Sequence, residues 1–131
     1  MTLILPIYWT KGKLKPKTSL VGMNLFRNQH HFDQAAMKRY FHDLVEQQLP
    51  TPLPTFDTYT MSYDIYYKSP ACDGSNIVAL IEKFVLDALV SNGAMPDDTV
   101  KRHLGSTWQI SGQDKLNPRI EVTITTKDTH A

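Results

Sequence analysis

Residues 72–90 have the sequence CDGSNIVALIEKFVLDALV, and this segment predicts a long helix. Apolar residues occupy almost every face of this predicted helix, so most of its surface is expected to be buried. Asp73 stands where an N-cap is expected, and Asn92-Gly93 is a typical signal for a helix end. The predicted helix therefore extends from about Ser75 to Ser91 and forms the centre of the core.

Shorter patterns on either side of this helix predict the remaining elements. Alternating or β-branched runs indicate strands at Leu3–Trp9, Leu20–Phe26, Thr58–Lys68, Val100–Ser111 and Arg119–Thr126. Pro6 makes the first of these an edge strand or a broken one. A second helix is predicted from Asp33, its expected N-cap, to Gln48. This order of elements predicts an α+β fold in which two main helices pack on a small mixed or antiparallel sheet.

The length and the composition limit the class of protein. A chain of 131 residues, 41% hydrophobic and 21% charged, is expected to form one globular domain, residues 1–131. It has no apolar run of 18 residues and no positively charged leader, so neither a membrane span nor a signal peptide is expected. Its single cysteine, Cys72, excludes an intramolecular disulfide framework and a Cys-rich zinc site. A soluble protein in the reducing cytoplasm is therefore expected.

Positive charge is concentrated in the first third of the chain. Residues 1–45 contain seven Lys or Arg and two acids, a net charge of +5, whereas the remainder has a net charge of −4. Such an asymmetry indicates a polyanionic partner. Four lysines alternate in the stretch from Thr10 to Ser19, which is predicted to be an exposed loop or hairpin arm: Lys11, Lys13, Lys15 and Lys17.

Three polar residues interrupt the central helix along one line. At 100° per residue, Lys83 and Asp87 lie within 20° of Asn76 around the helix axis. One interpretation is structural, with Lys83 and Asp87 as an (i, i+4) ion pair and Asn76 completing the first turn. The other is functional, because an unpaired polar stripe is costly in a core unless it opens onto a wet site.

Carboxylates flank the same helix at both ends. Taken alone, Asp73 is explained as a helix cap, and Asp97-Asp98 after a proline as a turn. Together with the polar stripe they favour a metal site, since two or three carboxylates and a lysine are what magnesium-dependent phosphodiester hydrolysis needs. The lysine would stabilise a transition state more anionic than the substrate.

The segment from Cys72 to Leu89, with Gly93 and Asp97-Asp98 after it, resembles the signature of the RusA family of Holliday junction resolvases, found mostly in phages and prophages. That signature is an Asp-rich turn ending in Asn, then Lys, Asp-Ala-Leu, Gly and Asp-Asp. The stretch Met23-Asn-Leu-Phe-Arg27-Asn is similar to the family's Asn- and Arg-bearing N-terminal region. The resemblance implies an intertwined α+β homodimer that nicks two strands of a four-way junction symmetrically.

Roles follow from the resemblance residue by residue. Asp73 and Asp98 match acidic metal ligands, and Lys83 matches the catalytic lysine. Asp97 and Asp87 are further candidate ligands of Mg²⁺, or of Mn²⁺ in its place. Well-known members have a second acid in the turn and two residues between Asn and Lys, where this chain has one acid and six residues. A third carboxylate must then come from elsewhere, with Asp87 preferred over Asp64 and Glu82.

The sequence therefore predicts a magnesium-dependent, structure-selective endodeoxyribonuclease in the cytoplasm of a bacterial host, encoded by the bacterium or a phage. It would need no small-molecule cofactor and no membrane. The residues expected to contact branched DNA are Lys11, Lys13, Lys15, Lys17, Asn24, Arg27 and Asn76. The missing second acid favours the alternative of a catalytically inactive RusA-like protein that still binds branched DNA. A protein-interaction module with no DNA role is a third alternative.

Overall fold

The computed structural model of the chain describes residues 1–126, in which six strands and three helices are formed. The strands are β1 (Thr2–Pro6), β2 (Tyr8–Lys11), β3 (Lys17–Leu20), β4 (Tyr59–Tyr67), β5 (His103–Gln113) and β6 (Arg119–Thr126). The helices are α1 (Met23–Arg27), α2 (His31–Gln48) and α3 (Gly74–Ser91). The predicted α+β class is confirmed, and α1 is added to the two main helices.

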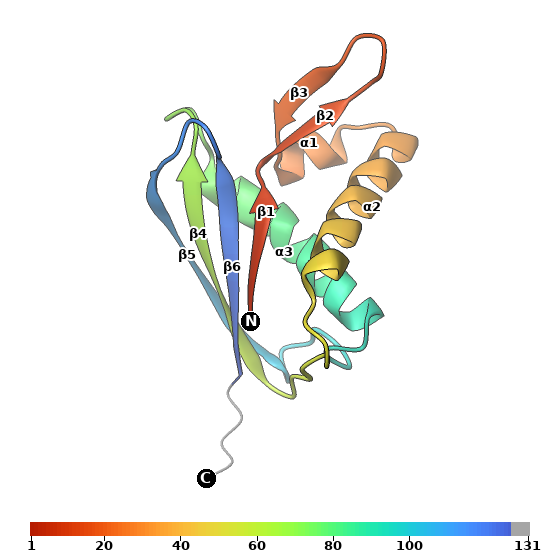
Figure 1. The fold of residues 1–131 in the computed structure, drawn as a ribbon, viewed down its shortest axis with the longest axis vertical. Helices are drawn as coiled ribbons and strands as arrows, with labels where there is room; N and C mark the ends of the chain where they lie inside the picture. Colours follow the sequence, from red (N-terminus) through yellow and green to blue (C-terminus); the bar gives the residue numbers. More distant parts are fainter. Residues whose placement is uncertain (127–131) are drawn as a thin grey trace.

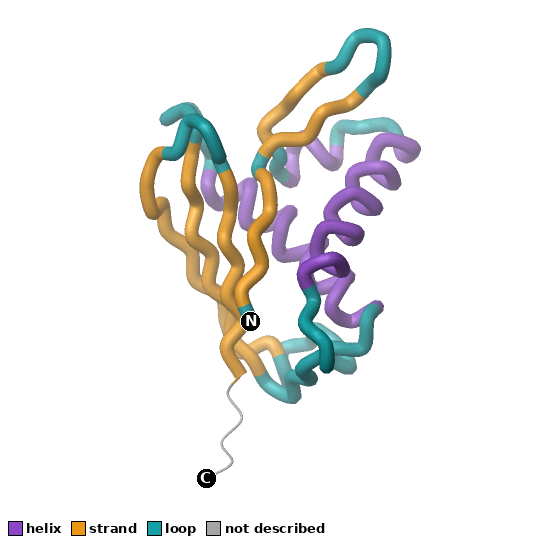
Figure 2. Tube along the Cα trace, in the orientation of Figure 1, coloured by secondary structure: helices purple, strands orange, loops and turns teal. Residues whose placement is uncertain are grey.

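Four of the strands form one mixed sheet in the order β1-β6-β4-β5. β6 lies antiparallel to both β1 and β4, and β5 runs parallel to β4 because α3 connects the two. Burial alternates along β4 and β6, with Ile120, Val122 and Ile124 buried as predicted. One face of the sheet therefore carries the core, and the helices cover that face (Figures 1 and 2).

α3 is the helix predicted from residues 72–90, and it is buried as expected. Its buried side chains surround most of the axis, including Ile77, Leu80, Phe84 and Leu89. Asp73 is its N-cap, and the chain leaves the helix through Asn92 and Gly93, whose φ of 83° suits glycine. α2 packs on α3 through Met37, Phe41 and Val45, with the rings of Phe41 and Phe84 stacked at 5.3 Å.

Three sequence predictions were wrong in detail. The strand expected at Val100–Ser111 is β5, which begins three residues later and ends two residues later. The strand expected at Leu20–Phe26 ends at Leu20, and α1 occupies Met23–Arg27. A short apolar run has no period long enough to separate strand from helix, and packing of Phe26 against Phe84 at 5.4 Å decides for the helix. α2 begins two residues early, because the His30 ring, in place of Asp33, accepts the capping hydrogen bond from the Phe32 N–H.

The first predicted strand is broken, as Pro6 suggested. β1 ends at Pro6, and after Ile7 the chain continues as β2, which pairs with β3 in a hairpin outside the main sheet. This hairpin, with the lysine-rich turn between its strands, projects from one end of the molecule (Figure 1). Among residues 1–126, no helix is both long enough and apolar enough to span a membrane.

Candidate functional site

Asp73 lies at the N-terminus of α3 and is exposed. Its Oδ1 accepts hydrogen bonds from the Asn76 N–H at 3.3 Å and from the Ser75 hydroxyl at 3.1 Å. No residue of the described part of the chain donates a hydrogen bond to Oδ2. One oxygen therefore caps the helix while the other remains available, so capping and ligand binding are compatible at this carboxylate.

Asn76 connects the start of α3 to α1. Its Oδ1 accepts a hydrogen bond from the Asn24 N–H at 3.0 Å. A Cβ added to Gly22 would lie 2.1 Å from the Asn76 amide nitrogen, so only glycine leaves room for this side chain. The predicted DNA-binding residues Asn24 and Asn76 are thus brought together, and the side-chain oxygen of Asn76 has a structural partner.

The other two residues of the polar stripe form an ion-pair group on the surface. Lys83 Nζ lies 3.8 Å from Asp87 Oδ2, and Lys38 Nζ of α2 lies 3.9 Å from the same oxygen. The Lys83 side chain is 44% exposed, so the lysine does not point into a dry core. The structural interpretation of Lys83 and Asp87 is therefore satisfied, and such an exposed pair contributes at most about 1 kcal/mol.

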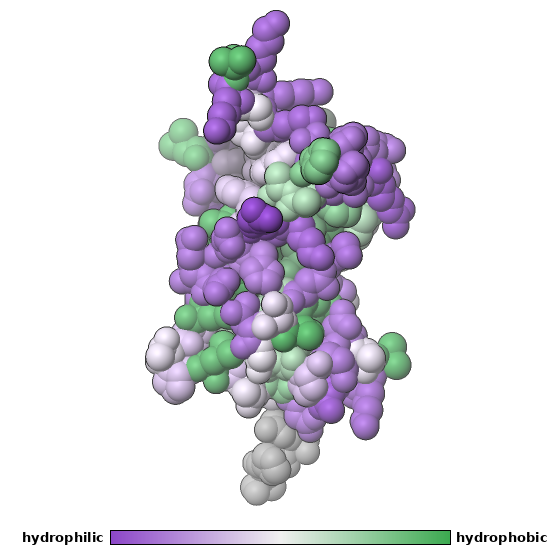
Figure 3. Space-filling view, turned by 90° about the vertical axis from the view of Figure 1, so that its right-hand side faces the viewer, coloured by the Kyte–Doolittle hydropathy of each residue, from purple (hydrophilic) through white to green (hydrophobic). Residues whose placement is uncertain are grey.

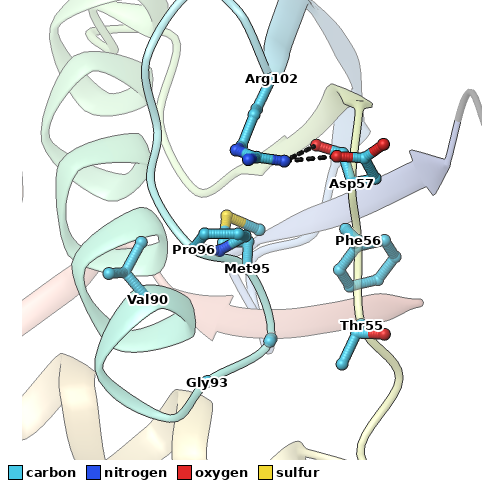
Figure 4. Close-up of a pocket in the computed structure, with 9 residues that line it drawn as sticks. Thr55, Phe56, Asp57, Val90, Gly93, Met95, Pro96 and Arg102 are labelled. Atoms are coloured by element: carbon cyan, nitrogen blue, oxygen red, sulfur yellow. Dashed lines mark hydrogen bonds and ion pairs between the residues drawn. The ribbon is translucent and has the colours of Figure 1, made fainter.

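The Asp97-Asp98 turn lies beyond the opposite end of α3. Asp97 accepts hydrogen bonds from the backbone and hydroxyl of Thr99 and from the Arg102 guanidinium at 3.2 Å. The bonds from Thr99, and then the Arg102 charge, lower the pKa of Asp97. Arg102 also pairs with Asp57 at the edge of a pocket that Phe56, Val90 and Met95 help to line, so the turn is held in place (Figure 4). Asp98 is exposed beside it.

Glu82 is the centre of a cluster of polar side chains that the sequence did not predict. Its Oε2 accepts hydrogen bonds from the hydroxyls of Tyr63 and Ser106, each at 2.7 Å. His103 Nε2 lies 2.7 Å from the Ser106 hydroxyl and 3.9 Å from Glu82 Oε1. The sequence contains one indication of this cluster. Glu82 lies about 120° around the helix axis from Asn76, on a face of the helix that is otherwise apolar.

Three carboxylates act together on the buried Tyr59 at the start of β4. The pKa of its hydroxyl is raised to about 12, first by burial and then by the negative charges of Asp98, Asp97 and Glu82, in that order. The Tyr59 ring also lies 5.2 Å from the His103 ring. Glu82 is therefore the carboxylate of α3 that acts on the same tyrosine as the Asp97-Asp98 turn.

The alternatives for a third ligand lie elsewhere. Asp87 pairs with the two lysines described above. Asp64 alternates with the buried Tyr63 along β4, which places it on the sheet face away from α3, where it accepts hydrogen bonds from Gln109 and Ser111. Of the three candidates, Glu82 is the one whose charge acts on the same tyrosine as the charges of the acidic turn.

Asp73 and the Asp97-Asp98 turn do not meet within one chain. They flank an 18-residue helix, which is about 27 Å long at 1.5 Å per residue. Among residues 1–126, no group of three or more His, Cys, Asp or Glu side chains is arranged to hold a metal ion. A site containing both carboxylates thus requires a second copy of the chain.

The predicted DNA-binding residues gather at the Asp73 end of the molecule. The lysine-rich turn projects there, and α1, which carries Arg27 and Asn24, is held against the first turn of α3 by Asn76. Lys11 pairs with Asp33 at 2.6 Å, and Lys13, Lys15, Lys17 and Arg27 are exposed.

In comparisons with known proteins, no family model and no curated protein matches the chain.

Proposed function

We propose that the protein is a magnesium-dependent, structure-selective endodeoxyribonuclease of the RusA type, which resolves Holliday junctions as a homodimer by paired symmetric nicks. The observation that carries the proposal is the distribution of carboxylates along α3. Asp73 lies at the basic end with one oxygen available, Glu82 lies at the middle of the helix, and Asp97 and Asp98 lie beyond its other end. The proposed setting is the cytoplasm of a bacterium, with the gene of bacterial or phage origin.

The homodimer is supported by the form of β5. This strand is an edge of the main sheet, spans 11 residues and is exposed along most of its length. Three large apolar side chains on it, Leu104, Trp108 and Ile110, are each about half exposed. A long, exposed and apolar edge strand is a template for pairing with another chain, and a second copy is the simplest partner.

Pairing at β5 would also bring the separated acids together. Two copies related by a two-fold axis perpendicular to the sheet pair their edge strands antiparallel. The Asp97-Asp98 turn precedes β5, whereas Asp73 follows β4, which runs parallel to β5. In such a dimer, the Asp73 end of one subunit therefore faces the Asp98 end of the other, and two equal sites result.

In this arrangement Asp73 of one subunit, with Asp98 and Asp97 of the other, would hold the cation. When bound, Mg²⁺ or Mn²⁺ lowers the pKa of an attacking water and neutralises charge on the phosphate. Lys83, which the family resemblance matches to the catalytic lysine, is ten residues or about 15 Å along α3 from Asp73 and pairs with Asp87, so we assign it no part in this site. The lysine-rich turn and Arg27 would contact phosphates, which fixes position and shape without reading base sequence.

The test is cleavage of a synthetic four-way junction in Mg²⁺, with binding in EDTA measured in parallel. The proposal expects paired nicks at symmetric positions and slower or no cleavage of linear duplex of the same sequence. Salt-sensitive binding without cleavage in Mg²⁺ or Mn²⁺ would instead support the inactive junction-binding protein. The single acid of the 73–76 turn and the ion pairing of Lys83 with Asp87 favour that second candidate. Absence of salt-sensitive DNA binding would contradict both and favour a protein-interaction module.

A further inference from the structure

The hairpin formed by β2 and β3 is a firmly based arm. Four residue pairs join its strands, from Tyr8↔Leu20 to Lys11↔Lys17, and the hydroxyls of Thr10 and Thr18 lie 2.7 Å apart. Trp9 is almost completely buried at its base, and Lys11 pairs with Asp33 of α2 at 2.6 Å. The position of the arm is therefore fixed by the body of the protein.

The turn at the end of the arm spans residues 12–16, with the sequence GKLKP. Gly12 has a φ of +92°, and a Cβ there would lie 3.1 Å from the Lys15 carbonyl oxygen, so the turn closes tightly on itself. Leu14, at its middle, is 99% exposed and stands between Lys13 and Lys15. Figure 3 shows an apolar group near the tip of an otherwise hydrophilic arm.

This placement is unusual in its combination of charge and apolar surface. Lys11 and Lys17 lie directly opposite one another in the hairpin, an arrangement in which like charges repel. Asp33 balances one of them, and every residue from Lys11 to Thr18 is exposed. Binding of a polyanion would relieve this repulsion. Leu14 would then contact the same ligand as the lysines on either side of it.

We infer that Leu14 is an apolar wedge that enters the base stack at the branch point of the DNA, with Lys13 and Lys15 on the flanking phosphates. The inference rests on the proposed function and adds the device by which the branch is recognised. Apolar side chains inserted between base steps unstack them, and this unstacking costs less at a branch point, where the base stack is interrupted, than inside a continuous duplex. A wedge of this kind would select branched DNA over linear duplex without reading sequence.

DNA explains the arm better than a membrane surface does. One leucine offers less apolar area than a single acyl chain, and a single acyl chain already binds membranes only marginally. Apart from Leu14, the outer part of the arm, residues 10–18, contains only lysine, threonine, glycine and proline, and it has no apolar face to lie in a bilayer.

The wedge can be tested with a four-way junction that contains 2-aminopurine at the branch point, in EDTA so that the DNA stays intact. Fluorescence of 2-aminopurine rises when the base is unstacked. The wild-type protein is expected to raise it several-fold, and Leu14→Ala to lose most of that rise while its Kd stays within about threefold of wild type. Leu14→Met should restore it. Leu116→Ala is the matched control, because Leu116 is 98% exposed in the loop between β5 and β6.

Each alternative result has its own meaning. A full fluorescence rise with Leu14→Ala, or wild-type binding without any rise, would overturn the wedge and leave the nuclease proposal intact. Failure of the folded wild-type protein to bind the junction would overturn both. Equal loss in Leu116→Ala would show that the signal does not report on the arm, and would also overturn the wedge. Binding to phosphatidylserine vesicles that disappears in Leu14→Ala, without junction binding, would assign the arm to membranes.

Discussion

The two roles of Asp73 can be separated by a pair of substitutions. Asn is a good N-cap, so Asp73→Asn keeps the acceptor for the Asn76 N–H and removes only the negative charge. Asp73→Ala removes the cap as well. If Asp73 is only a cap, the two variants differ in stability and both keep their activity. If Asp73 is a metal ligand, both variants lose that ligand, and both lose activity.

The expected stability changes follow from the structure of the first turn of α3. Loss of the cap in Asp73→Ala costs about 0.5–2 kcal/mol of unfolding free energy. Asp73→Asn loses only the interaction of a charge with the helix dipole, about 0.3–1 kcal/mol. For a domain of this size, 1 kcal/mol lowers Tm by about 3–6 °C. Both changes are small beside the unfolding free energy of about 5–15 kcal/mol that is typical of a domain, so activity is expected to be comparable between folded variants.

The assay measures urea unfolding, junction binding in EDTA and junction cleavage in Mg²⁺ on the same preparations. Outer-shell partners of a metal already cost about 10–100-fold when removed, so loss of a direct ligand should lower cleavage by about 100-fold or more. Junction binding should be unchanged or tighter in Asp73→Asn, because a negative charge is removed near the DNA. Wild-type cleavage by Asp73→Asn would remove Asp73 from the site and refute the assignment.

Four further predictions concern packing, pairing, charge and pH. Gly22→Ala should cost about 1–3 kcal/mol in urea unfolding, because its Cβ would lie 2.1 Å from the Asn76 side chain; Gly105→Ala, with open space around it, should be close to neutral, and equal effects would contradict this packing. Ile110→Lys should convert a dimer to a monomer in light scattering, whereas Phe32→Lys on α2 should leave it intact; an unchanged dimer in both would move the interface away from β5. Replacing Lys13 and Lys15 by Ser should reduce the slope of log Kobs against log salt by about 0.9 for each phosphate that the arm no longer neutralises, with Lys115→Ser as the control and an unchanged slope as the contrary result. The raised pKa of Tyr59, about 12, stabilises the folded state fully below the unfolded value of 10, and this contribution disappears as the pH rises from 10 toward 12; Tyr59→Phe should therefore flatten the fall in unfolding free energy over that range, and an equally steep fall would contradict the assigned surroundings.

The elements with a long and regular pattern were predicted well. β6 has the predicted bounds, and α3 differs by one residue at its start, because alternation over eight residues and burial around a whole helix are strong signals. The segment from Leu20 to Phe26 was mispredicted, since packing against Phe84, about 60 residues away, decides its structure. The residues around a short segment do not predict which distant side chain will pack against it.

The candidate site was predicted in composition and only partly in geometry. The cap at Asp73, the exposed lysine arm and the Lys83–Asp87 pair all follow from spacing along the chain. The cluster at Glu82 depends on how β4 and β5 lie against α3, which brings Tyr63 and Ser106 to one carboxylate. The distance between Asp73 and the Asp97-Asp98 turn follows from the length of α3. Whether a second subunit brings the two together depends on the dimer, which the sequence of one chain does not define.

Mixing two inactive variants tests the shared site most directly. Asp73→Asn and Asp98→Asn subunits would be unfolded together, refolded and assayed for nicking of a four-way junction in Mg²⁺. If each site takes Asp73 from one subunit and Asp98 from the other, a mixed dimer has one intact site, and about one quarter of wild-type sites return as single nicks. A mixture that binds the junction and stays as inactive as its components would contradict the shared carboxylate site.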